Sequence, residues 1–232
     1  DGVLYAGPGV NMNFNWGWEQ VGTFLEQVAR SHPATAEAAV RQLLDKTNAL
    51  YDGQPGDDAT GVGILARSPH RLMVFTGPPV DPARDVECVE RLLGFAGRKV
   101  VCGGTTGNLV AEYLGQGVDL DLTTQREEVP PIGSLPEIDL MTEGVLTLAK
   151  TLRLLKESQG QAARVSPDRN GATLLTRELL RADSIFFLAG EQMNPFYHNP
   201  LLPRNISIRH NLLEQIIEIL RGYHKSVEVE WV

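Results

Sequence analysis

Cysteine is nearly absent from this chain, and histidine is scarce. The two cysteines, Cys88 and Cys102, form no Cys-x-x-Cys pair, and the five histidines show no ligand spacing such as His-x-x-x-His. This pattern argues against a disulfide framework and against a zinc site, and it favours a reducing compartment. We therefore expect a cytoplasmic protein.

Long hydrophobic runs and an excess of basic residues are also missing. No apolar stretch approaches the roughly 20 residues that a membrane-spanning helix needs, and no signal peptide is visible. Lysine and arginine number 21 against 29 aspartates and glutamates, which gives a formal net charge of -8. This balance argues against broad binding to nucleic acid or to an anionic membrane, and it suits a protein that binds metal cations.

The chain is long and apolar enough to bury a sizeable core. Its 232 residues, 42% of them hydrophobic, suffice for one large domain or two modest ones. The sequence Ser68-Pro69-His70 marks a change of rhythm. We therefore predict a first domain over residues 1–68 and a second domain over residues 70–232.

The first domain has the pattern of a strand end, two helices and a strand. Asp1-Gly2-Val3 is interpreted as the end of a strand, and apolar spacing predicts helices over residues 18–28 and 33–50, the second opening at Pro33. The sequence of residues 60–67, Thr-Gly-Val-Gly-Ile-Leu-Ala-Arg, predicts a strand that its glycines weaken.

The second domain alternates strands and helices, which predicts an α/β fold with a mostly parallel sheet covered by helices. Residues 159–171 are polar and are expected to be loosely structured, and residues 190–203 are expected to form a loop. The strands are expected over residues 71–76, 99–102, 118–122, 184–189 and 226–232, the last at an edge. The helices are expected over residues 84–95, 142–156 and 208–222, with one helix after the turn 103–108 through Leu114 and one ending near Leu180.

Carboxylates stand at both ends of the two predicted helices of the first domain. Asp1-Gly2 opens the chain, and Asp57-Asp58 lies in the run Gly-Asp-Asp-Ala-Thr of residues 56–60. Taken alone, both are common turn sequences. If the helices between them fold back, the carboxylates meet and offer the hard oxygen ligands that Mn²⁺ and Mg²⁺ prefer.

The order of these motifs resembles the metal-dependent protein phosphatases (the type 2C family), in the branch typified by the sporulation stage II protein E phosphatase. Asp1-Gly-Val-Leu-Tyr-Ala-Gly, with Gly17-Trp18 following, is similar to the Ser/Thr-Asp-Gly-Val motif of that branch. Asp57-Asp58-Ala59-Thr60 is similar to its Asp-Asp-x-Thr motif. The resemblance covers roughly residues 1–67 and implies that they form part of a phosphatase α/β sandwich.

The resemblance also implies a reaction and a ligand set. Two Mn²⁺ or Mg²⁺ ions roughly 3.5–4 Å apart would share a water and lower its pKa, and the hydroxide would attack a phosphoserine or phosphothreonine of a bacterial signalling phosphoprotein in sporulation or stress regulation. Asp1 and Asp57 would be the catalytic metal ligands, Gly2 would let the backbone approach the ions, and Asp58 would support the site.

One part of the family pattern is missing. The family also carries an Asp-Gly-x-Gly motif and an upstream acidic residue that bridge the ions, and this sequence has neither before Asp1. Because the chain opens on Asp1 without an initiator methionine, we expect it to be a piece of a longer phosphatase. We expect residues 1–232 to be inactive alone.

A glycine-rich segment in the second domain offers an alternative, non-enzymatic function. Cys102 precedes Gly103, Gly104, Thr105, Thr106, Gly107 and Asn108, between a predicted strand and a predicted helix. Backbone N–H groups there would hold a phosphorylated small molecule or nucleotide, or the segment is only a tight turn capped by a threonine. A cysteine phosphatase would need an arginine six positions after Cys102, where this sequence has Asn108. Cys102 itself is expected to be a small buried hydrophobic residue. The second domain could also dock a phosphoprotein or mediate homodimerisation.

Overall fold

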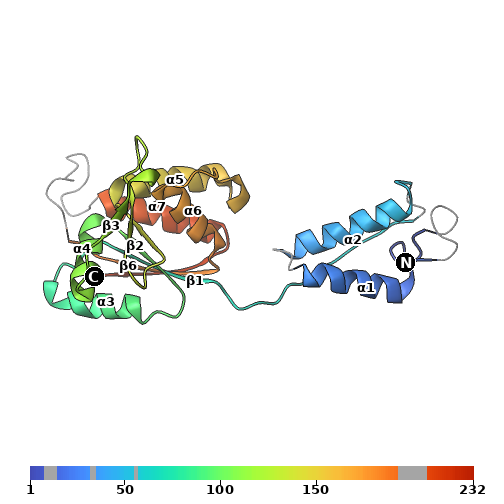
Figure 1. Cartoon of the computed structure of the whole chain (residues 1–232), viewed down its shortest axis with the longest axis horizontal. Helices are drawn as coiled ribbons and strands as arrows, with labels where there is room; N and C mark the ends of the chain where they lie inside the picture. Colours follow the sequence, from blue (N-terminus) through green and yellow to red (C-terminus); the bar gives the residue numbers. More distant parts are fainter. Residues whose placement is uncertain (8–14, 32–34, 55–56, 193–207) are drawn as a thin grey trace. The chain divides into compact units, whose positions relative to one another are not determined.

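The protein divides into two compact units, Asp1–Ser68 and Pro69–Val232, in a computed structural model. The structure describes residues 1–7, 15–31, 35–54, 57–192 and 208–232. The division falls at the Ser68-Pro69-His70 sequence (Figure 1). None of the described helices is long and apolar enough to cross a membrane.

The first unit contains the two helices that the apolar spacing predicted. Helix α1 (Gly17–Arg30) buries Val21 and Val28. Helix α2 (Ala36–Leu50) begins after Thr35, whose Oγ1 accepts a hydrogen bond from the Ala38 N–H at 3.1 Å. The side-chain cap therefore sets the start of this helix at Ala36, and the expected start at Pro33 lies outside the described residues.

The opening residues are a turn and not the end of a strand, which corrects the sequence prediction. The Tyr5 N–H donates to the Asp1 carbonyl oxygen at 2.9 Å, and the Gly17 N–H donates to the Leu4 carbonyl oxygen at 2.8 Å. These bonds fold the segment back on itself, so the backbone groups that a strand would offer to a neighbour are already used.

The segment of residues 60–67 is also not a paired strand in the described part of the chain, because nothing there offers it a ladder of hydrogen bonds. It runs along α2 (Figure 1). A Cβ atom at Gly61 would lie 2.9 Å from Val40 Cγ1, and one at Gly63 would lie 2.7 Å from Val40 Cγ2. The glycines thus allow close packing on α2 and turn Val62 and Ile64 outward, where they are 85% and 93% exposed.

The second unit is built on a seven-stranded sheet in the order β3-β4-β5-β2-β1-β6-β7. Its parallel part confirms the predicted fold class of an α/β protein with a mostly parallel sheet. Two short strands extend it antiparallel at one edge. The parallel strands are β1 (Arg71–Thr76), β2 (Arg98–Cys102), β5 (Leu140–Thr142), β6 (Ser184–Ala189) and β7 (Ser226–Trp231), and the antiparallel ones are β3 (Asp119–Asp121) and β4 (Ile132–Ser134).

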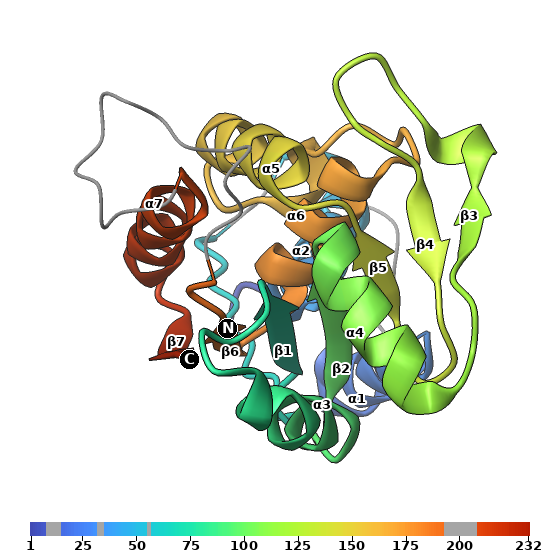
Figure 2. The same cartoon turned by 90° about the vertical axis from the view of Figure 1, so that its left-hand side faces the viewer.

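Helices cover both faces of this sheet (Figure 2). Leu72 and Val74 of β1 belong to the core under one set of helices, whereas Met73 and Phe75 belong to the core under the other. A central strand that is buried on both faces is expected to be apolar throughout, which is why β1 was readable from the sequence. One face carries α5 (Val145–Ser158), α6 (Gly171–Arg181) and α7 (Ile208–Gly222), and the other carries α3 (Asp85–Leu93) and α4 (Gly104–Leu114).

The region between α4 and α6 departs most from the sequence prediction. Thr142, expected near the start of a helix, ends strand β5, and α5 begins after Gly144. Strands β4 and β5 were not predicted, because three residues are too few to show a period. Three short 3-10 helices also fill connections: η1 (Pro82–Arg84), η2 (Leu122–Thr124) and η3 (Ala162–Arg164).

The polar stretch before α6 is ordered by a capping box and an ion pair. Asn170 Oδ1 accepts from the Ala172 and Thr173 N–H groups, and Thr173 Oγ1 accepts from the Asn170 N–H. Asp168 receives two bonds from Arg126, at 2.5 and 2.9 Å, and one from Asn170. The Arg126 guanidinium and then the Asn170 amide lower the pKa of the Asp168 carboxyl to about 2.

This depressed pKa makes a prediction about acid stability. Asp168 is protonated more readily in the unfolded chain, near its ordinary pKa of about 4, so its contribution is present above that pH and is lost as the pH falls toward about 2. We expect the urea midpoint of Asp168→Asn to be lower than that of the parent at neutral pH and to converge with it across this window. Asp119→Asn, which removes an exposed carboxylate without a side-chain bond in the described residues, is the control. Parallel pH profiles for Asp168→Asn and the parent would contradict the assignment.

Candidate functional site

The structure brings Asp1-Gly2 and Asp57-Asp58 together. A Cβ atom at Gly2 would lie 2.3 Å from the Asp58 carbonyl oxygen and 2.9 Å from its carbonyl carbon, so the two backbones touch where Gly2 has no side chain. The Tyr51 hydroxyl donates a buried hydrogen bond of 2.9 Å to the Gly2 carbonyl oxygen. The end of α2 and the turn after it are thereby attached to the opening residues.

The carboxylates at this junction lie at the surface. Asp1, Asp57 and Asp58 are exposed, whereas Gly2 is buried between them. Asp1 Oδ1 accepts from the Gly2 N–H at 3.0 Å, and Asp57 Oδ1 accepts from the Asp58 N–H at 2.8 Å. Such bonds to the adjacent residue fix each carboxylate against its own turn.

Hard oxygen ligands at this junction suit Mn²⁺ or Mg²⁺, but they are few. Within the described residues there is no group of three or more His, Cys, Asp or Glu side chains that could hold a metal ion. Gly2 and Asp58 bring their backbones into contact, but the side chains of Asp1, Asp57 and Asp58 do not gather into such a group, and a two-ion centre requires more ligands than these.

The contact between Gly2 and Asp58 predicts the effect of a single methyl group. In Gly2→Ala the new Cβ atom overlaps backbone that cannot rotate away, so we expect the first unit to lose about 1–3 kcal/mol of stability. Hydrogen exchange of the α1 and α2 amides in the full chain would measure this loss.

A matched control lies in the interior of α1. Nothing is within 4 Å of a Cβ atom at Gly22, so Gly22→Ala should leave stability unchanged or raise it by up to about 1 kcal/mol. Equal exchange rates in Gly2→Ala and Gly22→Ala would show that the junction does not hold the first unit together.

The segment expected as a turn at Gly103–Asn108 is almost entirely the first part of α4, which corrects the sequence prediction. Gly103 is the N-cap, with φ of 130°, and no side chain caps the helix. Thr106 Oγ1 accepts instead from the Gly77 N–H at 2.8 Å, in the loop after β1. Gly104, Thr105 and Asn108 are exposed, so the uncapped N-terminus of α4 opens at the carboxyl edge of the sheet.

Cys102 is a buried structural residue, in agreement with the sequence prediction. Its side chain is fully buried, and its thiol donates to the Glu143 carbonyl oxygen at 3.3 Å. Burial raises the pKa of this thiol to about 11, so the nucleophilic thiolate is scarce at neutral pH. The buried Cys102 thiol therefore lacks the exposure and the thiolate character that a nucleophilic cysteine needs.

Sequence reasoning missed Arg209, in the first turn of α7. A Cβ atom at Gly77 would lie 2.5 Å from Cζ and Nη1 of Arg209, so the guanidinium packs on the backbone just after β1. Its Nη2 donates to the Gln192 carbonyl oxygen at 2.7 Å. A single arginine in an amphipathic helix gives no sequence signal, because its position depends on which strand lies beside which.

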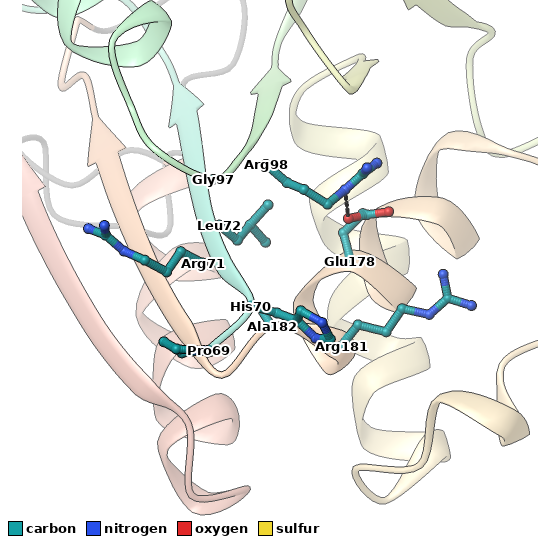
Figure 3. Close-up of a pocket in the computed structure, with 9 residues that line it drawn as sticks. All are labelled: Pro69, His70, Arg71, Leu72, Gly97, Arg98, Glu178, Arg181 and Ala182. Carbon is teal, nitrogen blue, oxygen red and sulfur yellow. Dashed lines mark hydrogen bonds and ion pairs between the residues drawn. The ribbon is translucent and has the colours of Figure 1, made fainter. Parts of the chain in front are cut away.

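A pocket of about 500 Å³ opens at the opposite, amino edge of the sheet (Figure 3). Its strongest polar contact is internal: Arg98 pairs with Glu178 at 2.5 Å and with Asp139 at 3.1 Å. Arg71 lies over the Phe95 ring, 5.0 Å from its centroid. Arg181 has no ion pair in the described part of the chain, so this pocket is basic but most of its charge is already satisfied.

Comparison with known proteins gives no relative for this chain: no protein-family model, curated protein or solved structure matches it. Both the carboxylate junction and the carboxyl edge of the sheet are therefore judged on their own geometry.

Proposed function

We propose that the unit Asp1–Ser68 is part of a metal-dependent phosphoserine and phosphothreonine phosphatase of the type 2C family. The observation that carries the proposal is the contact between Gly2 and Asp58, which joins the two carboxylate motifs across two helices. In this proposal Asp1 and Asp57 are the metal ligands, and Asp58 supports the turn that presents Asp57.

The residues of the junction have distinct parts in this chemistry. Bound Mn²⁺ or Mg²⁺ would supply a hydroxide at neutral pH and offset the charge of the phosphoryl group. Gly2 lets the two segments approach, and Tyr51 fixes the Gly2 carbonyl by its 2.9 Å hydrogen bond. Hydrolysis of the phosphoserine or phosphothreonine ester would consume one water and release inorganic phosphate and the free hydroxyl.

The first unit also has a surface suited to further strands of a phosphatase sandwich. Residues 60–67 pack on α2 through Gly61 and Gly63 and expose Val62 and Ile64. An unpaired extended segment with an apolar outer face is a site for strand addition. We propose that a neighbouring sheet covers this face and brings the remaining acidic ligands from outside the described residues.

The setting that fits this proposal is the bacterial cytoplasm, with a signalling phosphoprotein as the substrate. Cys88 and Cys102 are both free and buried, which suits a reducing compartment. The net charge of -8 suits a protein that holds divalent cations.

The test is Mn²⁺-dependent hydrolysis of a phosphoserine peptide by the protein as its own cells make it, and by its variants. Loss of a group that only orients a metal ligand costs roughly 10–100-fold in activity, so removing a direct ligand in Asp57→Asn should lower the rate by about 100-fold or more. Residues 1–232 by themselves should show no hydrolysis, because no group of three or more potential metal ligands lies among the residues that the structure describes.

The control is Asp45→Asn, which removes an exposed carboxylate on α2 of the same unit and should leave the rate unchanged. The proposal fails if the protein as its own cells make it has no metal-dependent activity, or if Asp57→Asn keeps the activity of Asp45→Asn.

A further inference from the structure

The second unit reverses its winding between β1 and β6. The chain runs outward from β1 to β2 and β5, and then returns to place β6 and β7 on the other side of β1. In open α/β sheets ligands bind beyond the carboxyl ends of the strands at such a reversal. Here that position is the edge formed by the ends of β1, β2, β5 and β6, opposite to the pocket of Figure 3.

A cation that has no countercharge among the described residues lies at this edge. The Arg209 guanidinium packs on Gly77, immediately after β1, and in the described part of the chain it donates only to a backbone carbonyl and has no ion pair. Burial lowers the pKa of this guanidinium, which shows that its charge is partly removed from water. A half-buried cation without a countercharge is costly, and an anionic ligand would offset that cost.

Buried oxygen atoms at the same edge also lack partners. Thr76, the last residue of β1, is fully buried, and apart from a weak contact with the neighbouring Cys102 thiol its Oγ1 has no hydrogen bond in the described residues. Glu143, which follows β5, has a buried Oε2 atom that is likewise unpaired there. Thr76 lies two residues after Val74 on β1, so the two side chains point to the same face of the sheet. That face carries α7 and Arg209. Buried polar atoms without partners call for a ligand.

Two helix N-termini meet beside these groups. Neither α4 nor α5 has a side-chain cap, and a Cβ atom at Gly144, the N-cap of α5, would lie 3.4 Å from Gly103 Cα, the N-cap of α4. Thr106 Oγ1 of α4 accepts a hydrogen bond from the Gly77 N–H, and Arg209 packs on the same glycine. Both α4 and Arg209 therefore contact Gly77. Helix N-termini and a guanidinium together favour a phosphate group.

We propose that this carboxyl edge binds a phosphorylated small molecule that carries hydroxyl groups, such as a sugar phosphate or a nucleotide. Arg209 and the first turn of α4 bind the phosphate. Glu143 accepts hydrogen bonds from the hydroxyl groups, and Thr76 completes the polar surface behind them. All of these groups belong to the second unit, so the proposal does not depend on phosphatase activity of the first.

The experiment is calorimetric titration of the full chain in EDTA, so that no divalent ion can bridge a phosphate to Asp57. The probes are ribose 5-phosphate, AMP, adenosine and inorganic phosphate. We expect the two organic phosphates to bind, inorganic phosphate to bind more weakly, and adenosine not to bind. A preference for AMP over ribose 5-phosphate would identify a nucleotide, and equal affinities would identify a sugar phosphate.

Variants assign the binding to the proposed groups. Arg209→Met should lower the affinity for ribose 5-phosphate and AMP by at least about tenfold, since a charged hydrogen bond to the phosphate is lost. Its unliganded Tm should be unchanged or higher, because no ion pair is broken, so weak binding cannot be blamed on unfolding. Glu143→Gln should lower the affinity for ribose 5-phosphate and leave the affinity for inorganic phosphate unchanged.

The matched control is Arg181→Met, which removes an arginine from the amino-edge pocket and should not change any affinity. The proposal is overturned if no phosphorylated probe binds at millimolar concentration, if Arg209→Met binds like the parent, or if Arg181→Met loses as much affinity as Arg209→Met.

Discussion

The absence of a side chain at residue 2 is the constraint on which the first unit depends. Any Cβ atom there would enter the space of the Asp58 backbone, so only glycine allows the opening turn to touch the segment after α2. The Tyr51 hydroxyl then bonds the carbonyl of the same glycine. Two carboxylate motifs more than 50 residues apart along the sequence are adjacent because of this contact, and the proposed metal chemistry requires it.

The second unit uses close backbone approach for a different purpose. Its parallel strands place their carboxyl ends on one edge, and the reversal of winding beside β1 leaves that edge open to a ligand. Because Gly77 has no side chain, the Arg209 guanidinium packs against its backbone. The Gly77 N–H donates a hydrogen bond to Thr106 Oγ1. Close backbone approach thus joins two sequence motifs in the first unit and places a guanidinium beside the end of β1 in the second.

The sequence predicted those elements whose pattern is local. Strands β1 and β6 are buried on both faces and are continuously apolar, and α7 has a regular apolar stripe, so all three were readable. Strands β4 and β5 were too short to show a period. Residues 60–67 have the composition of a strand but no strand to pair with in the described chain. The position of Arg209 beside β1 depends on the strand order, which the local sequence does not reveal. The local sequence pattern therefore could not predict which strands pair or which elements lie side by side.

Paramagnetic broadening by Mn²⁺ tests most directly whether the two carboxylate motifs form one site. In an NMR titration of the full chain, substoichiometric Mn²⁺ should broaden the amide signals of residues 2–5 and of residues 58–60 together. The broadening of both sets should disappear in Asp57→Asn. If only one segment broadens, or if Asp57→Asn leaves the other segment unchanged, the two motifs do not share an ion and the account of the first unit is wrong.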